Sequence, residues 1–239
     1  AEFTCGLLNS QPMGFYAPHS LVDDAKLHGV EVLPVHPNHS SWDSEITAGK
    51  LQLGWRIVQG LHRAQGDQLI AGRPYHSLPD FLRRVPLHRN VLLRIAMGGT
   101  FAAFGLSPRE ALWHVLEHHR RRASVQGDLF LDGTYEVAPH EGGRFRPLDN
   151  FSRIKEEYDA FSLSTHGHPM MALRSQMPLA RFNTRSAKKL PNGTRVTIAG
   201  LILVRQRPPT AKGMTFSTIE DEFGFLDMAI PPDIWEKVK

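Results

Sequence analysis

Apolar residues recur at the spacing of an amphipathic helix through much of the first two thirds of the chain. This spacing predicts helices at residues 18–28, 55–71, 78–84, 88–97 and 149–161. A further helix is expected after Ser107, because serine suits the position before a helix and Pro108 suits its first residue. Two short strands are expected, at residues 30–35 and 51–53.

The pattern changes to the alternation of a β-strand after residue 190. Strands are predicted at residues 196–204, 214–219 and 224–230, with a turn at 221–224 and a short helix at 233–238. Three strands and a helix correspond to the first part of an oligonucleotide-binding (OB) barrel, whose closing strands would lie beyond Lys239. The predicted fold class is therefore α+β and multidomain, with a mainly helical region followed by a truncated OB-fold β-barrel.

The amino-acid composition indicates the class of protein and its expected cellular location. The sequence has 41% apolar and 22% charged residues, as is ordinary for a globular protein. Cys5 is the single cysteine, so an internal disulfide is impossible and a reducing, cytoplasmic location is expected. No apolar run approaches the roughly 18 residues that a membrane span needs, so no membrane partner is predicted.

Positive charge is concentrated late in the chain. The net charge is +4, and residues 160–219 contain no Asp or Glu. A stretch of this kind attracts polyanions, although a solvated basic surface would look the same. Its cations are Arg174, Arg181, Arg185, Lys188, Lys189, Arg195, Arg205, Arg207 and Lys212.

Glycines between the predicted helices resemble those of helix-hairpin-helix units. Such a unit presents backbone N–H groups at a helix N-terminus to a phosphate, and glycine permits the close approach. Gly60 and the Gly98-Gly99 pair are the candidates. The first hairpin is degenerate, since His62 stands where a second glycine is typical, and a plain helical hairpin remains the alternative.

Residues 123–147 lack periodicity and predict a linker and domain boundary. Within them Gln126, Asp128, Leu129 and Phe130 have the form of a sliding-clamp-binding peptide. An extended peptide of this type places adjacent apolar side chains in a dry pocket, while the glutamine forms hydrogen bonds upstream. The alternative is that Leu129 and Phe130 pack on the neighbouring helices.

Two phenylalanines of the predicted barrel, Phe216 and Phe225, lie on adjacent strands. Aromatic side chains with a basic rim are typical of surfaces that hold single-stranded nucleic acid. Arg195, Arg205, Arg207 and Lys212 would form that rim. The alternative is that one or both rings fill the barrel core.

The sequence lacks recognised catalytic and metal-binding patterns. Pairs of histidines occur at 36 and 39, 114 and 118, and 166 and 168, but none has a third ligand at a recognised spacing. A metal-dependent hydrolase is therefore disfavoured. The sequence also has no nucleophile elbow and no phosphate-binding loop with Lys-Ser or Lys-Thr. No catalytic residue and no metal site are predicted.

Several long strings, in order, resemble the bacterial C-family DNA polymerases, the group of the replicative alpha subunit. They begin with "LLNSQPMGFYAPHSLVDDAKLHGVEVLPV" and continue through "REALW" and "EEYDAFSLSTHGHPM". The strings "LVRQRPPTAKG" and "IEDEFG" are most similar to the error-prone branch, which works in damage-induced mutagenesis. The spelling of the clamp peptide leaves the choice between the error-prone and replicative branches open.

The resemblance implies a division of the chain into four parts. These are the end of the fingers (1–50), a helix-hairpin-helix region for duplex DNA (51–125), the clamp peptide with a linker and helix (126–190), and a partial OB-fold near the template strand (191–239). The family's palm carboxylates, which bind Mg²⁺, lie upstream, so no cofactor is expected in this chain. The implied partners are duplex DNA, single-stranded template, the sliding clamp and other proteins of the mutagenesis complex. The alternative is a stand-alone nucleic-acid-binding module or a non-functional polymerase remnant.

Overall fold

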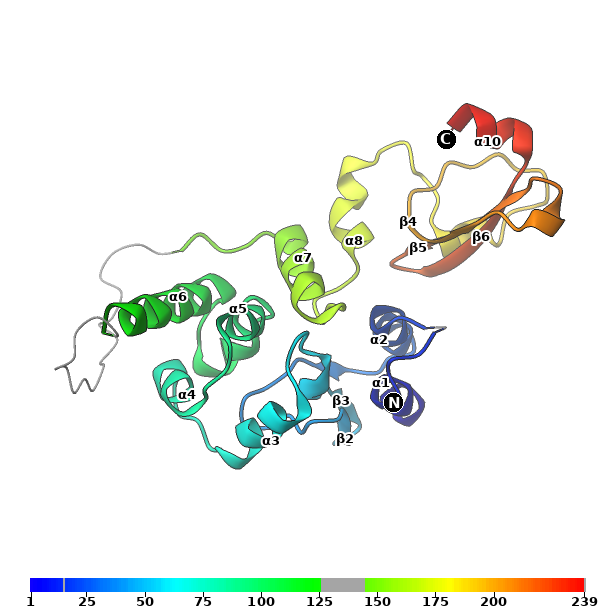
Figure 1. Cartoon of the computed structure of the whole chain (residues 1–239). Helices are drawn as coiled ribbons and strands as arrows, with labels where there is room; N and C mark the ends of the chain where they lie inside the picture. The colour runs from blue at the N-terminus through cyan, green and yellow to red at the C-terminus, as the bar shows by residue number, and fades with distance from the viewer. Residues whose placement is uncertain (15, 126–144, 239) are drawn as a thin grey trace. The chain divides into compact units, whose positions relative to one another are not determined.

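The computed structural model describes residues 1–14, 16–125 and 145–238. The chain divides into two compact units, Ala1–His166 and Gly167–Lys239, which are described separately. Both contain helices and strands (Figure 1), so the predicted α+β class is confirmed, with a helical region preceding a small sheet.

The first unit is mainly helical. Its small sheet has the order β1-β3-β2, with β1 parallel and β2 antiparallel to β3. Trp55, Phe81 and Phe101 are completely buried in one continuous apolar core. The elements are α1 (Glu2–Asn9), α2 (Pro18–Leu27), β1 (Val32–Leu33), β2 (Glu45–Thr47), β3 (Lys50–Gln52), η1 (Trp55–Ile57), α3 (Arg63–Ala71), α4 (Leu78–Arg84), α5 (Arg89–Met97), η2 (Thr100–Phe104), α6 (Pro108–Val125) and α7 (Asn150–Phe161).

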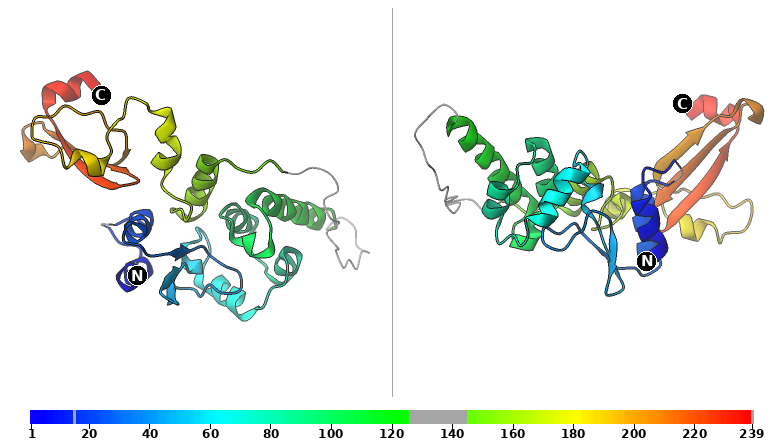
Figure 2. Two further views of the ribbon diagram at one scale, coloured as in Figure 1. Left: turned by 180° about the vertical axis from the view of Figure 1, so that it is seen from behind. Right: turned by 60° about the horizontal axis from the view of Figure 1, so that its bottom comes forward.

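The second unit is built around the antiparallel sheet β4-β5-β6. The strands lie side by side in the right-hand view of Figure 2, and the register shifts between Ile202 and Val204. The described residues form an open sheet, with no closed barrel among them. The elements are α8 (Pro169–Leu173), η3 (Arg174–Gln176), α9 (Thr184–Ala187), β4 (Leu201–Gln206), η4 (Pro209–Ala211), β5 (Thr215–Asp221), β6 (Gly224–Ile230) and α10 (Pro232–Val238).

A buried carboxylate fixes the segment before this sheet. Asp221, at the end of β5, accepts hydrogen bonds from the backbone N–H of Thr184 at 2.8 Å and from its hydroxyl at 2.6 Å. Arg174 donates to Asp221 at 3.2 Å and pairs with Glu222 at 2.6 Å. Arg174, one of the predicted basic-surface cations, is therefore neutralised within its own unit.

Several predicted elements differ from the structure. The helix expected over 55–71 is wrong in its first half, because the chain turns at Gly60, where φ is +81°. The strand expected from residue 196 begins at Leu201, and Val196 is 39% exposed outside the sheet. The sequence interpretation did not predict α1, α8, α9 or β2. The strand predicted at 224–230 is confirmed with the same ends.

Candidate nucleic-acid interface

Two turns of the first unit have the same order of parts. The first hairpin, residues 55–63, contains η1, then Gly60 in the left-handed region, then buried Leu61 and exposed His62 before α3 begins. The second hairpin, residues 100–109, contains η2, then Gly105 with φ +74° before α6 begins. A positive φ is inexpensive only for glycine, so each turn requires one at this point.

Each hairpin presents the exposed N-terminus of a helix. The backbone N–H of His62 donates to the Gln65 side chain at 3.0 Å, and that of Ser107 donates to Glu110 at 2.7 Å. In the first turn of α3, the amides of Arg63 and Ala64 have no acceptor within the helix. In α6 that holds for the Arg109 amide, since Pro108 has no N–H and the Glu110 N–H donates to Ser107 Oγ at 3.3 Å. Unsatisfied amides and the helix dipole together make such ends favourable for a phosphate.

An arginine connects the first hairpin to the helix that precedes the second. Arg94 of α5, the helix that leads into the second hairpin, donates to the carbonyl of Gln59 in the first hairpin at 2.7 Å. A Cβ atom at Gly60 would lie 2.9 Å from the same guanidinium group. Gly60 therefore serves both the turn and the close approach of α5.

The predicted Gly98-Gly99 pair has a different role from Gly60. Gly98 is the C-cap of α5, and a Cβ there would lie 2.1 Å from Cζ of Phe161 on α7. Its small size thus allows α7 to pack against α5. Gly99 has φ +76° and open space around it, and it begins η2. The counterpart of Gly60 is Gly105, which the sequence interpretation missed although it immediately precedes Leu106 and the recognised cap Ser107.

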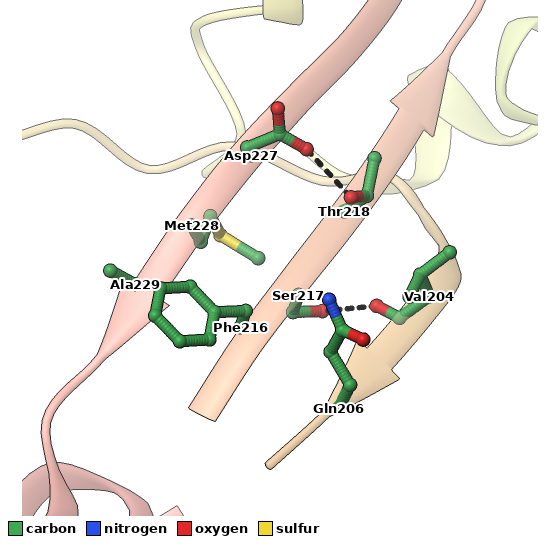
Figure 3. A pocket seen from close by; sticks show the side chains of 8 residues that line it. All are labelled: Val204, Gln206, Phe216, Ser217, Thr218, Asp227, Met228 and Ala229. Atoms are coloured by element: carbon green, nitrogen blue, oxygen red, sulfur yellow. Dashed lines mark hydrogen bonds between the residues drawn. The ribbon is translucent and has the colours of Figure 1, made fainter. Parts of the chain in front are cut away.

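The sheet of the second unit has an open hollow of about 510 Å³ on one face (Figure 3). Phe216 lines it and is 39% exposed, with Gln206 and Ala229 opposite it on the adjacent strands. Beside this row, Thr218 donates to Asp227 at 2.6 Å. The face thus offers one accessible aromatic ring among polar and small apolar side chains.

Phe225 does not line this hollow. It is half-buried and lies opposite Glu220, four residues along β5 from Phe216. That separation is about 13–14 Å at the rise of an extended strand. The two predicted stacking rings therefore do not form one platform.

The predicted basic rim is exposed but partly engaged with α10. The Arg205 guanidinium lies 5.3 Å from the centre of the Trp235 ring, and Arg207 lies 3.9 Å from Glu236. Lys212, in the left-handed region at φ +49°, and Arg195 are exposed. The described structure thus places the four cations around the sheet and its preceding segment.

The predicted clamp peptide, residues 126–130, lies outside the described residues.

The histidine pair at 36 and 39 lies in the first unit. The two rings are stacked 4.0 Å apart, and burial, assisted by repulsion from His39 and Arg73, lowers the pKa of His36 to about 4. His36 Nδ1 already accepts the Asn38 N–H at 3.1 Å. His36 is therefore neutral at pH 7 and accepts a hydrogen bond within its own turn.

A comparison with protein families agrees with the helix-hairpin-helix geometry of the two turns. The family described as "Helix-hairpin-helix motif" matches residues 29–111, which include Gly60 and Gly105. None of the helices in the described part of the chain is long and apolar enough to cross a membrane.

The whole chain is homologous to part of several bacterial proteins named error-prone DNA polymerase. It is 37% identical over 256 residues to one from Anaeromyxobacter sp. (strain K), covering 100% of this chain. Relatives from Bdellovibrio bacteriovorus and Corynebacterium efficiens are 36% and 35% identical over 98% and 99% of this chain. The chain spans only 22–24% of the length of these relatives. The predicted resemblance to error-prone polymerases is confirmed in this form.

Proposed function

We propose that this chain is a DNA-binding segment of a bacterial error-prone DNA polymerase that acts in the cytoplasm on damaged templates. The observation that carries the proposal is the pair of hairpins with matching geometry, in a chain homologous over its full length to such polymerases. Polymerisation itself, with Mg²⁺ held by palm carboxylates, belongs to other parts of the polymerase.

The hairpins bind the duplex through its phosphates. Amides at the N-termini of α3 and α6 donate to phosphate oxygens, and the helix dipoles favour the negative charge. Contacts of this kind fix the position of the duplex without reading its sequence. A polymerase that extends many different sequences needs such contacts.

The sheet of the second unit holds the single-stranded template as part of an OB-fold. Phe216 provides a stacking surface in the open hollow, and Arg195 and Lys212 supply charge nearby. Aromatic stacking tolerates any base, because every base has a π face. The second unit thus complements the duplex contacts of the hairpins.

Substitutions at the helix caps test the duplex contact. Ser107→Asp and His62→Asp keep a side chain able to cap the helix but place a carboxylate at each proposed phosphate position. Each should raise the dissociation constant for a labelled duplex about tenfold in fluorescence anisotropy, since like-charge juxtaposition is strongly unfavourable. Ser77→Asp is the matched control, because Ser77 caps α4 by accepting from the Asp80 N–H at 3.2 Å, away from both hairpins. Equal effects of all three substitutions would contradict the proposal.

Recruitment to DNA is assigned to the sliding-clamp peptide at Gln126, Asp128, Leu129 and Phe130. The support is its sequence form, with Leu129 and Phe130 as apolar anchors for a dry pocket. Surface plasmon resonance with immobilised bacterial clamp should detect micromolar binding that Leu129→Ala/Phe130→Ala abolishes. Retention of binding by the double variant would remove the peptide from the proposal and leave the DNA contacts intact.

A further inference from the structure

Three arginines surround a hollow beside the second hairpin. Arg109 lies in the first turn of α6, Arg146 precedes α7, and Arg153 lies in the first turn of α7. The hollow has a volume of about 200 Å³, and all three arginine residues are exposed. We call it the arginine hollow. Its remaining lining is Ala102, Leu106, Ser107, Pro108, Pro147 and Leu148.

The arginines of the hollow have acidic neighbours but, within the described part of the chain, form no ion pair with them. Among the described residues, none of the three arginines forms an ion pair, and the hydrogen bond from Arg109 goes to the neutral carbonyl of Arg146 at 3.0 Å. The nearby Glu110 accepts the Ser107 N–H. Burial raises the pKa of Glu156, and Arg109 opposes that rise. Three like charges held together without an ion pair among the described residues favour an anion, although Glu156 offsets part of the charge of Arg109.

The shape and chemistry of the hollow fit a phosphodiester. Guanidinium groups donate paired hydrogen bonds in a geometry that matches phosphate oxygens. The apolar lining from Leu106, Pro108 and Leu148 offers contact area to the adjoining sugar and reduces local hydration. The hollow also adjoins the α6 N-terminus, which the second hairpin already presents to the duplex.

We propose that the arginine hollow binds a backbone phosphate of duplex DNA, next to the phosphate contacted by the second hairpin. This inference rests on the proposed function and extends it beyond residues 29–111, because Arg146 and Arg153 lie outside the matched helix-hairpin-helix segment. The segment around the start of α7 then belongs to the DNA interface. This segment follows the proposed clamp peptide in sequence, so a proposed clamp contact and a proposed DNA contact lie close together along the chain.

The test compares duplex binding by the intact 239-residue chain and by Arg146→Gln/Arg153→Gln. Both changes are at exposed positions, so the fold, checked by circular dichroism, should persist. The slope of log K against log salt should become shallower by about 0.9 for each phosphate that the variant no longer neutralises. The dissociation constant should rise at least about tenfold at low salt, equally for unrelated sequences, because charge-assisted hydrogen bonds to the backbone are removed.

Arg120→Gln/Arg121→Gln is the matched control. It also removes two charges, from α6 and about 16 Å along that helix from Arg109 at 1.5 Å per residue, and both arginines already pair with Glu117. The control should leave the salt slope unchanged, whereas Arg146→Lys/Arg153→Lys should retain most of it. An equal loss of affinity in the control would mean that general charge, and not the hollow, carries the effect.

The outcomes distinguish failure of the arginine-hollow proposal from failure of the proposed function. A double variant that binds duplex as the wild type does would overturn the hollow and leave the hairpins in place. A wild type that does not bind duplex at low salt would refute the proposed function and the hollow together. If inorganic phosphate at constant ionic strength raises the melting temperature of the wild type alone while DNA affinity is equal, the hollow binds free phosphate and the DNA assignment falls.

Discussion

Gly98→Ala should destabilise the first unit through one contact. The added Cβ would lie 2.1 Å and 2.2 Å from Cζ and Cε2 of Phe161, whereas carbon atoms in contact are about 3.5–4.0 Å apart. The ring would have to retreat by more than about 1 Å. Phe161 is only 3% exposed, so it has little space in which to move.

The magnitude follows from overpacking. Inserting a methyl group into a filled core costs about 1–3 kcal/mol. The backbone adds no penalty, because φ at Gly98 is −71° and alanine adopts it readily. A unit of this size loses about 2–4 °C of melting temperature per kcal/mol. A cost of about 2 kcal/mol therefore lowers the melting temperature by about 4–8 °C.

Thermal unfolding followed by circular dichroism measures this cost. Phe161→Leu is the second substitution of a double-mutant cycle with Gly98→Ala. The smaller side chain vacates the space that the methyl group needs. Gly98→Ala/Phe161→Leu should therefore be no less stable than Phe161→Leu alone, with a favourable coupling of about 1 kcal/mol or more. Additive losses of stability would refute the steric argument. A second refutation would be weaker duplex binding by folded Gly98→Ala, since a packing role predicts unchanged affinity.

Two further variants test the hydrogen-bonded cluster around Glu157 and the sheet face that carries Phe216. Glu157→Gln should cost about 2–4 kcal/mol at pH 7 in urea unfolding, because the buried carboxylate accepts hydrogen bonds from Ser164, Thr165 and His166. Burial alone would raise the pKa of Glu157, but these donors lower it overall. Its contribution is present above the unfolded pKa and is lost as pH falls through the lowered folded pKa, so the stabilities of the wild type and the variant should converge only below that folded pKa. Phe216→Ala should weaken single-strand binding about tenfold, from the roughly 1–3 kcal/mol of base stacking, with duplex binding unchanged. Equal losses of affinity for both forms of DNA in anisotropy titrations would contradict stacking on Phe216.

Sequence reasoning succeeded where one element carries a complete local signal. The strand at residues 224–230 is a short, mostly apolar run that directly follows a turn, and Ser107-Pro108 has both parts of a helix start. It failed where distant packing decides the role. Gly98 and Gly60 look alike in sequence, yet only the structure brings Phe161 onto one and Arg94 beside the other.

The candidate site had the same limitation. The sequence interpretation took Gly60 for the first hairpin and Gly98-Gly99 for the second, whereas the turn whose backbone matches that at Gly60 lies at Gly105. A single glycine before leucine and a helix cap would have located Gly105. The arginine hollow could not be predicted, because its members are separated by 37 positions between Arg109 and Arg146 and meet only through tertiary contact.

The hydrogen bond from Arg94 to the Gln59 carbonyl would give the proposed DNA interface a form of shape selectivity. It ties the first hairpin to α5, which leads into the second hairpin within one packed unit, and so helps to hold the two helix ends at a set spacing. Two phosphates can occupy both ends only when the groove between them has the matching width, whatever the bases are. An RNA–DNA hybrid with A-form geometry presents another spacing and should bind more weakly than B-form DNA. Discrimination between nucleic-acid duplexes would then depend in part on a hydrogen bond that touches no nucleic acid.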